Sequence, residues 1–369
     1  MKKKKIVIVF GTRPEIIRFA PVIRELEKIN KVKIILLYTG QHYSDNLSQV
    51  FFDEFKIKPS NINLGVGEMS PVAQLGEIIK RAGRALLPVQ PDVVCVWGDT
   101  NSSLGVSLAA NKLSLKLAHI EAGCRSFDFR MAEEYNRIVI DHISNFLFPV
   151  STNDKNNLIR EKVGGEIFSV GDPLFDIFKD NVKRLKARKE KKFPNLTQKY
   201  ALLTLHRAEN VDSRSILKRI LKELIRVRSH KIVFPIHPRT KKMIKKFGLT
   251  GLLKGKNIIL MSPVGYLEIL ELILGSDLII TDSGGIQKEA FFARKPCLTL
   301  RKSTEWKDTV KLGANILLNP EESKDMDKLV FLVKDIDQVK RQLHMIKDKP
   351  YGQGNSSKEI AKILIKLAS

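Results

Sequence analysis

The chain has 369 residues, a formal net charge of +24 at pH 7 and 43% hydrophobic residues. This length exceeds what one ordinary hydrophobic core supports and favours two domains. The hydrophobic content excludes a disordered chain, and no apolar run reaches the roughly 18 residues that a membrane-spanning helix needs. We therefore expect a globular protein with two cores.

The N-terminus and the cysteines indicate a cytoplasmic protein. The run Lys2–Lys5 precedes only five apolar residues, too few for the hydrophobic region of a signal peptide, and no small-residue cleavage site follows. Cys95, Cys124 and Cys297 are odd in number and widely spaced, so neither a disulfide framework nor a zinc site is indicated.

The positive charge does not by itself indicate nucleic-acid binding. Its densest run, residues 183–192, has no aromatic side chains on which bases could stack, and we interpret it as a helix end leading into a linker. Surface lysine and glutamate enrichment would also fit a heat-adapted protein. A positive field favours an anionic small substrate, so we expect such a substrate and neither a nucleic-acid nor a membrane partner.

Short β-rich runs alternate with amphipathic stretches. Because alternating strands and helices indicate parallel sheets, two such series indicate two doubly wound, Rossmann-like α/β domains. The tail, residues 356–367, is predicted to cross back to the first domain. The first series has predicted strands at 5–10, 32–38, 92–97, 116–120 and 146–149 and helices at 14–28, 71–87 and 102–112. The second series has predicted strands at 201–205, 231–236, 257–260, 277–281 and 296–300.

The segment at residues 278–290 is the most informative. An apolar strand ends at Asp282, turns through Ser283, Gly284 and Gly285, and starts a helix that carries Glu289. Glycines let a backbone approach a ligand closely, and helix N-terminal amides suit phosphate. Glu289 is placed to accept hydrogen bonds from ribose hydroxyls. The pattern predicts a nucleoside diphosphate site; the competing interpretation is an ordinary strand-to-helix turn whose glycines serve packing.

Acidic and basic residues follow the strands of the first series, at the carboxyl ends where open α/β sheets bind ligands. Arg13 lies beside a predicted helix N-terminus that would suit a diphosphate. Asp99 and Glu121 end two strands, and Glu133 follows with Arg137 one turn later. Three converging acids suit general acid–base chemistry. Alternatively, Asp99 caps a helix and the neighbouring Glu134 pairs with Arg137 or Arg130.

The second series offers cations rather than acids. His206 and Arg207 follow its first strand and would offset the charge of a leaving diphosphate. Tyr266 is interpreted either as the wall of a uracil pocket or as a packed aromatic, and His237 as structural. The late acidic pairs Asp325/Asp327 and Asp335/Asp337 are typical of solvated helix faces, so no metal ion and no cofactor is predicted.

Taken together, these segments resemble the non-hydrolysing UDP-N-acetylglucosamine 2-epimerase family. The resemblance implies a GT-B-like pair of Rossmann domains around an interdomain cleft, usually in a homodimer. We place residues 1–175 with the helix at 354–369 in a domain of catalytic acids, and residues 176–353 in a UDP-binding domain. The matching segments are Phe10–Glu15, Gly98–Thr100, Glu121–Gly123, Glu133–Arg137, His206–Asn210, Asp282–Ala290 and Pro350–Gly352.

The resemblance also implies a reaction. UDP is eliminated from UDP-N-acetylglucosamine to give 2-acetamidoglucal, and its return on the reprotonated sugar gives UDP-N-acetylmannosamine, without a cofactor. The implied catalytic residues are Asp99, Glu121, Glu133 and His206. The implied substrate-binding residues are Arg13, Arg18, Arg137, Arg207, Tyr266, Ser283, Gly284, Gly285 and Glu289. Which acid removes the C2 proton is not decided by the sequence.

The chain also departs from the family pattern. Arg18 stands where many members have lysine, and Ala132 replaces a proline. Trp306 lies in a segment that resembles epimerases acting on UDP-2,3-diacetamido-2,3-dideoxyglucuronate, which is a second candidate substrate. The second, activating substrate site is only partly matched, at Gln41–Tyr43 but not at Leu64–Met69. Three competing hypotheses for the function are a hydrolysing epimerase, a glycosyltransferase and a catalytically silent UDP-sugar sensor.

Overall fold

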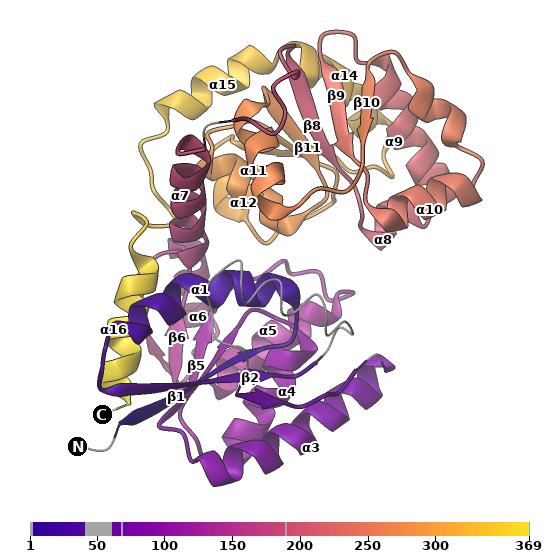
Figure 1. Ribbon diagram of the computed structural model, residues 1–369. Coiled ribbons are helices and arrows are strands. Elements are labelled where there is room, and N and C mark those ends of the chain that lie inside the picture. Colours follow the sequence, from indigo (N-terminus) through magenta and orange to yellow (C-terminus); the bar gives the residue numbers. More distant parts are fainter. Residues whose placement is uncertain (1–2, 41–60, 68, 189, 369) are drawn as a thin grey trace. The chain divides into compact units, whose positions relative to one another are not determined.

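The computed structural model describes residues 3–40, 61–67, 69–188 and 190–368. The chain divides into two compact units, unit 1 with Met1–Ile177 and Lys349–Ser369, and unit 2 with Phe178–Asp348. The sequence places the corresponding boundaries at residues 175 and 353. Helix α7 (Pro173–Lys186) runs across the first boundary (Figure 1).

Unit 1 is built on a seven-stranded parallel sheet of order β3-β2-β1-β4-β5-β6-β7. Its strands are β1 (Lys4–Phe10), β2 (Val32–Tyr38), β3 (Ile62–Asn63), β4 (Val93–Trp97), β5 (Leu117–Ile120), β6 (Phe146–Phe148) and β7 (Glu166–Ile167). Its helices are α1 (Arg13–Glu27), α3 (Pro71–Val89), α4 (Asn101–Lys112), α5 (Ala132–Ile143), α6 (Thr152–Arg160), the first residues of α7, and α16 (Ser356–Leu367).

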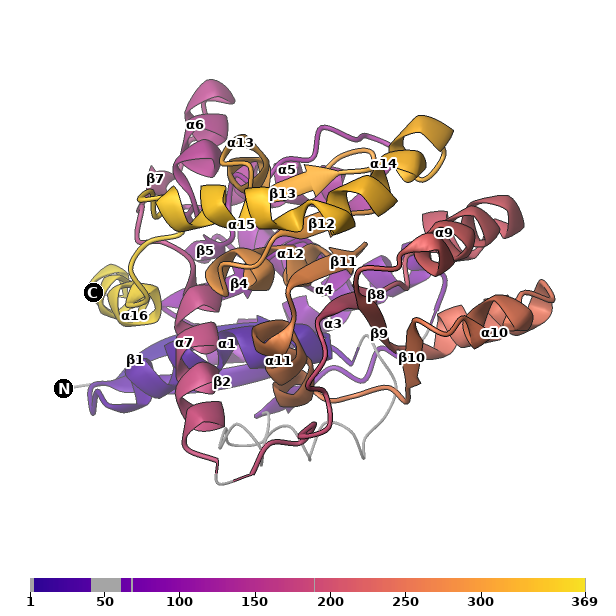
Figure 2. The same ribbon diagram turned by 90° about the horizontal axis from the view of Figure 1, so that it is seen from above.

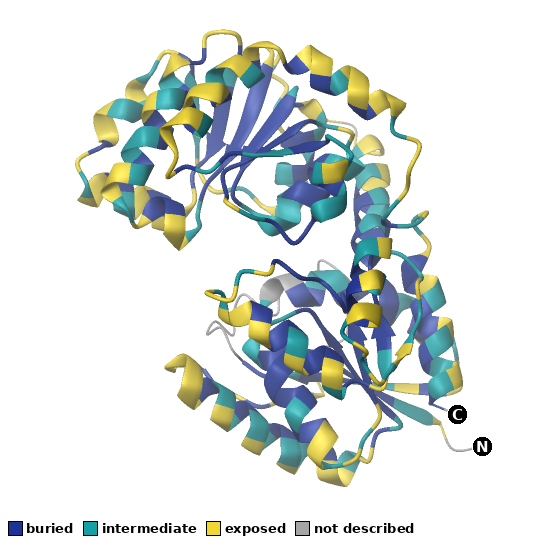
Figure 3. Ribbon diagram, turned by 180° about the vertical axis from the view of Figure 1, so that it is seen from behind, coloured by how far each residue is buried: buried dark blue, intermediate teal, exposed yellow. Residues whose placement is uncertain are grey.

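The sheet of unit 1 is buried on both faces, as a parallel sheet requires. Alternate residues of β1 enter different cores: Ile6 and Ile8 pack with α1 and α16 on one face, and Val7 and Val9 pack with α3 and α4 on the other. Figure 3 shows these central strands as buried. The C-terminal helix α16 lies beside α1, so the last residues of the chain complete the first core.

Unit 2 repeats the plan with a six-stranded parallel sheet of order β10-β9-β8-β11-β12-β13 (Figure 2). Its strands are β8 (Tyr200–Thr204), β9 (Lys231–Pro235), β10 (Ile258–Met261), β11 (Leu278–Thr281), β12 (Cys297–Thr299) and β13 (Asn315–Leu317). Its helices are α8 (Ala208–Val211), α9 (Arg214–Arg226), α10 (Pro238–Lys246), the 3-10 helix η1 (Thr250–Lys254), α11 (Tyr266–Gly275), α12 (Gly284–Phe292), α13 (Lys307–Lys311), α14 (Ser323–Lys334) and α15 (Ile336–Met345).

The predicted strands and helices are confirmed to within one or two residues at each end. Three strands of two or three residues at the sheet edges, β3, β7 and β13, are not predicted. All three cysteines are buried with free thiols. Among the described residues, no helix combines the length and the apolar character required to cross a lipid bilayer.

Candidate functional site

The carboxyl edge of the unit 1 sheet is organised around Glu15, a residue that the sequence pattern did not single out. Its buried carboxylate accepts hydrogen bonds from the backbone N–H groups of Gly11 and Thr12, at 2.8 Å each, and from the hydroxyl of Thr100 at 2.7 Å. Burial raises the pKa of Glu15, and these hydrogen bonds oppose the rise. Glu15 thus ties the loop after β1 to the loop after β4. The Thr-x-x-Glu capping box was the available sequence signal.

Glu121 follows β5 in a strained backbone conformation, with φ at +72°. Residues other than glycine rarely adopt this left-handed backbone region, and such backbone strain often accompanies functional sites. One carboxylate oxygen of Glu121 lies 3.7 Å from the Arg18 guanidinium, and the other accepts a hydrogen bond from the indole of Trp97 at 3.4 Å. Glu121 is 7% exposed, so its carboxylate is held at the sheet edge by a cation and an indole.

Asp99 belongs to the same charged cluster. Its carboxylate pairs with the guanidinium of Arg137, and its backbone carbonyl accepts a hydrogen bond from Asn136 at 2.8 Å. Burial raises the pKa of Asp99; Glu121 adds to the rise, and Arg137 and Arg18 oppose it. Burial disfavours the charged form of Arg18, yet the carboxylates of Glu121 and Asp99 raise its pKa above the ordinary value. Two predicted acids and two predicted cations therefore meet here.

The adjacent acids Glu133 and Glu134 have different environments. Glu134 is fully buried and accepts hydrogen bonds from the backbone N–H groups of Ser126 and Phe127 and from Arg137, at 2.8–2.9 Å. This is the pairing with Arg137 that the sequence left open. Glu133 is exposed in the first turn of α5. No hydrogen bond or ion pair among the described residues joins Glu133 to Asp99 or Glu121.

A buried network of hydrogen bonds and ion pairs packs beneath the carboxyl edge of the unit 1 sheet. No sequence pattern predicted this network. His119 contacts the carboxylate of Asp141 at 2.7 Å through Nδ1 and the carbonyl of Gly98 at 2.9 Å through Nε2. Asp141 also pairs with Arg125 at 2.8 Å and accepts the N–H of Gly123 at 3.0 Å. Burial opposes ionisation of Asp141, but His119, Arg125 and Gly123 hold its pKa below the ordinary value.

The carboxyl edge of the unit 2 sheet is organised by Asp282, which follows β11. This buried carboxylate accepts hydrogen bonds from the backbone N–H groups of His206 and Arg207, at 2.9–3.1 Å, and from the amide of Asn210 at 3.2 Å. It also lies 3.2 Å from Nδ1 of His206. Burial opposes ionisation of Asp282, but His206 and the two backbone N–H groups hold its pKa below the ordinary value. The imidazole of His206 is 40% exposed, so it is oriented yet accessible.

The predicted phosphate turn begins helix α12. Ser283 is the N-cap residue, and Gly284 and Gly285 form the first turn. A Cβ at Gly284 would lie 3.1 Å from Oε1 of Glu305 and 3.9 Å from the guanidinium of Arg207, whereas a Cβ at Gly285 would meet nothing within 4 Å. The open side at Gly285 leaves the N-terminus of α12 approachable by an anion.

The segment around Trp306 is built onto this helix. The indole N–H of Trp306 donates to the carbonyl of Gly284 at 2.8 Å, and the ammonium of Lys288 lies 3.8 Å from the centre of the indole. Thr304 donates to the side-chain carbonyl of Gln287 at 2.7 Å. Lys288 and Trp306 are both buried. The segment around Trp306, which departs from the family pattern, therefore holds the start of the phosphate turn in place.

Glu289 and Tyr266, for which ribose and uracil contacts are predicted, contact each other. The hydroxyl of Tyr266 hydrogen-bonds the carboxylate of Glu289 and receives a hydrogen bond from Asn181. Burial, and then the charge of Glu289, raise the pKa of Tyr266. His237 accepts the backbone N–H of Arg239 at 3.2 Å and caps α10, in keeping with a structural role.

Most of the predicted site residues gather in two groups. Unit 1 brings together Asp99, Glu121, Arg18 and Arg137. Unit 2 brings together His206, Arg207 and Asp282 at the end of β8, with the start of α12 next to Arg207. Arg13 begins α1, and its side chain lies outside the described part of the structure, as do residues 41–43.

Fold and site together define a two-domain α/β protein of the Rossmann type. Acids lie at the carboxyl edge of the unit 1 sheet, and a phosphate-type turn lies at the carboxyl edge of the unit 2 sheet. The sequence model of the UDP-N-acetylglucosamine 2-epimerase family matches residues 24–365, and the chain belongs to this family of epimerases.

Individual relatives match over their whole length. The UDP-N-acetylglucosamine 2-epimerase of Methanocaldococcus jannaschii is 42% identical, with 98% of each chain covered. The crystal structure of that enzyme with UDP-GlcNAc and UDP has a TM-score of 0.85, covering 99% of this chain and 100% of that one at 41% identity. The UDP-2,3-diacetamido-2,3-dideoxy-D-glucuronate 2-epimerase of Pseudomonas aeruginosa is 36% identical, with 98% of this chain and 100% of that one covered. These matches confirm the GT-B-like fold class; the cleft between the domains stays a prediction.

Proposed function

We propose that this protein is a non-hydrolysing UDP-N-acetylglucosamine 2-epimerase, which interconverts UDP-N-acetylglucosamine and UDP-N-acetylmannosamine. The observation that carries the proposal is the full-length similarity to the Methanocaldococcus jannaschii enzyme, at 42% identity. That enzyme has been crystallised with UDP-GlcNAc and UDP. Acids in unit 1 and cations in unit 2 supply the two kinds of group that the reaction needs.

The acids handle the proton at C2. One carboxylate takes the C2 proton while the C1–O bond breaks, and its electron pair leaves on the β-phosphate oxygen of UDP. The resulting 2-acetamidoglucal has a C1–C2 double bond. A second acid protonates C2 from the opposite face, and UDP adds back at C1. Asp99 and Glu121 are our candidates, because both carboxylates lie at the carboxyl edge of the sheet and burial raises the pKa of Asp99 above its ordinary value, as suits a group that exchanges protons. Glu133 remains a third candidate on the family resemblance alone.

The cations meet the charge of the departing diphosphate. His206, oriented by Asp282, and Arg207 are proposed to face it together with the N-terminus of α12 at Ser283, Gly284 and Gly285. Glu289 is proposed to accept the ribose hydroxyls and Tyr266 to border the uracil. The remaining cations, Arg13, Arg18 and Arg137, are assigned to the substrate side of the site. Two domains that close around the sugar would keep the glucal from escaping.

The direct test of this function is product analysis. Purified protein with UDP-N-acetylglucosamine should form UDP-N-acetylmannosamine with no net release of UDP at equilibrium. Continuous accumulation of UDP and free N-acetylmannosamine would instead identify a hydrolysing epimerase. UDP-sugar binding without any product, from UDP-N-acetylglucosamine and from the diacetamido-uronate alike, would identify a silent sensor.

A second candidate substrate is UDP-2,3-diacetamido-2,3-dideoxyglucuronate. Two observations favour it, the Trp306 segment and the 36% identity to the Pseudomonas aeruginosa epimerase. Side-by-side kcat/KM values with the two sugars decide between them. The homodimer is proposed from the resemblance and the cytoplasmic location from the sequence features described above. Sedimentation of the pure chain tests the homodimer.

A further inference from the structure

Three neighbouring strands of the unit 2 sheet begin beside lysines. Lys199 immediately precedes β8, Lys231 opens β9, and Lys256 lies two residues before β10. The three strands are parallel neighbours with β9 in the middle, so these lysines lie at the amino edge of the sheet. The phosphate turn and His206 lie at the carboxyl ends of β11 and β8, so the lysines mark a different place in the domain.

Hydrogen bonds fix the backbone of this edge closely. The backbone N–H of Lys231 donates to the carbonyl of Lys199 at 3.0 Å, and the Lys231 ammonium donates to the carbonyl of Lys256 at 3.0 Å. The buried amide of Asn257 donates to the carbonyls of Leu224 and Val227 at 2.8 Å each. The chain around the lysines is therefore anchored to the core at the end of α9.

A pocket of about 330 Å³ opens among these residues. It is lined by Gln198, Lys199, Arg228, Ser229, His230, Lys231, Lys256 and Asn257. Five of these eight residues are basic and none is acidic. Within the described part of the chain, none of the three lysines or Arg228 forms an ion pair with a carboxylate.

Charges of both signs surround the buried histidine of the pocket. Burial lowers the pKa of His230, and Asp277, whose carboxylate lies 3.9 Å from Nε2, opposes this shift most strongly. Lys340 and Lys199 lower the pKa further, and Asp337 opposes them. Adjacent strands are about 4.8 Å apart, which is less than the Debye length of about 8 Å at physiological salt. An anion bound at this edge would therefore lie within the screening distance of more than one lysine.

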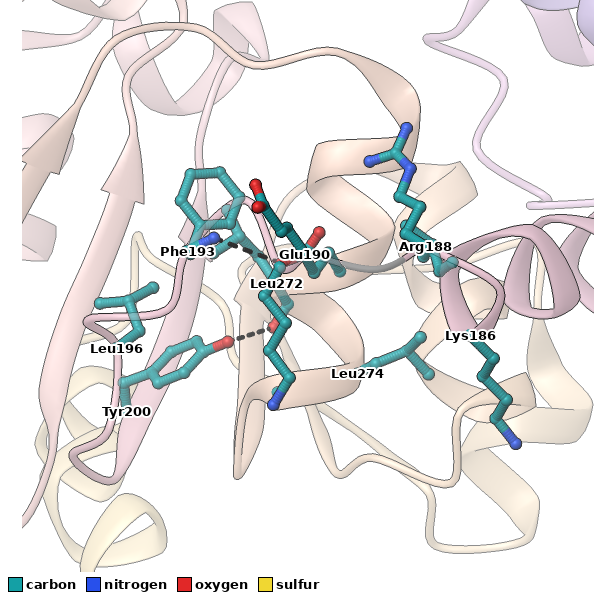
Figure 4. A pocket seen from close by; sticks show the side chains of 12 residues that line it. Lys186, Arg188, Glu190, Phe193, Leu196, Tyr200, Leu272 and Leu274 are labelled. Carbon is teal, nitrogen blue, oxygen red and sulfur yellow. Dashed lines mark hydrogen bonds between the residues drawn. The ribbon is translucent and has the colours of Figure 1, made fainter.

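A second pocket in the same unit provides a comparison (Figure 4). It measures about 440 Å³ and is lined by leucines, Phe193 and Tyr200, with Lys186, Arg188 and Lys191 offset by Glu190 and Glu271. Glu271 accepts the backbone N–H of Lys192 at 2.8 Å. Because acids and bases are mixed there, this pocket has no comparable preference for an anion.

We propose that the basic pocket at residues 198–199, 228–231 and 256–257 binds a small multivalent phosphate anion of the pyrophosphate class, at a site separate from that of the UDP-sugar. The lining supplies ammonium, guanidinium and amide donors, which suit phosphate oxygens. It contains no Phe, Tyr or Trp side chain on which a base could stack, which disfavours a polynucleotide. Its volume lies at the lower end for ligand pockets, in keeping with a small anion.

Calorimetric titration of the full chain with sodium pyrophosphate at physiological ionic strength tests the proposal. The pocket variant is Lys199→Gln/Lys256→Gln, and the matched control is Lys186→Gln/Lys191→Gln beside the second pocket. All four lysines are exposed, so both variants should fold, and thermal unfolding checks this. We expect the pocket variant to weaken binding by about tenfold, as loss of two exposed attractions predicts, and the control to leave it unchanged.

The same titration with UDP present separates this site from the active site. Pyrophosphate binding that persists in the presence of UDP supports the proposal. If the protein proves to have no epimerase activity, it should still bind pyrophosphate equally well. Absence of binding to the parent chain, equal weakening in both variants, or complete competition by UDP would each overturn it.

Discussion

Asp282 holds His206 at two points, through the backbone N–H at 3.0–3.1 Å and through Nδ1 of the imidazole at 3.2 Å. Because the carboxylate is buried and its pKa is held below the ordinary value, it stays ionised at neutral pH. An ionised carboxylate on Nδ1 fixes the imidazole with Nε2 available to a ligand. In the proposed mechanism this pair faces the departing UDP.

Asp282→Asn should lower kcat by roughly a hundredfold with a smaller change in KM, the size found when one oriented donor to a developing charge is lost. His206→Asn should cost a similar amount, and the double variant should cost hardly more than either alone, because the two residues act as a unit. Steady-state kinetics of the three variants test this. Additive losses would show that Asp282 does not act through His206.

Asp99→Asn should keep UDP binding and lose about a thousandfold in C2 inversion, within the range for removal of a general base. Thermal shift with UDP measures the first property and product formation the second. Glu121→Gln is the matched comparison, since both substitutions remove one charge at the same sheet edge. Full activity of Asp99→Asn would remove Asp99 from the mechanism.

Trp306→Phe should raise KM for the UDP-sugar several-fold and lower stability by about 1 kcal/mol, the usual net value of one hydrogen bond. The substitution removes the indole N–H that holds the Gly284 carbonyl and keeps an aromatic face for Lys288. Lys288→Met is the control, because it retains the indole hydrogen bond. If only Lys288→Met raised KM, the phosphate turn would depend on the buried cation instead.

Asp141→Asn should destabilise unit 1 by about 3 kcal/mol at pH 7, the cost of leaving buried partners uncompensated. The folded-state pKa of Asp141 is lowered, so the parent gains this stability above the ordinary carboxyl value and loses it as the pH falls. Denaturant unfolding should therefore show the two proteins converging below about pH 4. Asp327→Asn, whose carboxylate on α14 is 68% exposed, is the control and should change little at either pH. A difference that persists unchanged in acid would contradict the assigned role of Asp141.

The sheets and the strand-end residues were predictable because each rests on local pattern. Buried parallel strands are continuous apolar runs, and Asp99, Glu121 and His206 closely follow such runs. The family resemblance then gave these positions their roles.

The features that escaped prediction depend on contacts between distant residues or on helix phase. His119 and Asp141 are 22 positions apart and meet only because β5 and α5 pack together. Glu133 and Glu134 are adjacent in sequence, and only the helix phase separates an exposed carboxylate from a buried one. Lys199, Lys231 and Lys256 come together only through the strand order β10-β9-β8, which no local pattern reveals.

Proton NMR of UDP-N-acetylglucosamine with the pure protein in heavy water, without added metal, tests the central claim most directly. Elimination and re-addition require the C2 proton to exchange with solvent. We expect the C2 proton signal to disappear while the anomeric signal of UDP-N-acetylmannosamine grows. An unchanged C2 proton, with the sugar demonstrably bound, would contradict the proposed epimerase and direct attention to the diacetamido-uronate substrate.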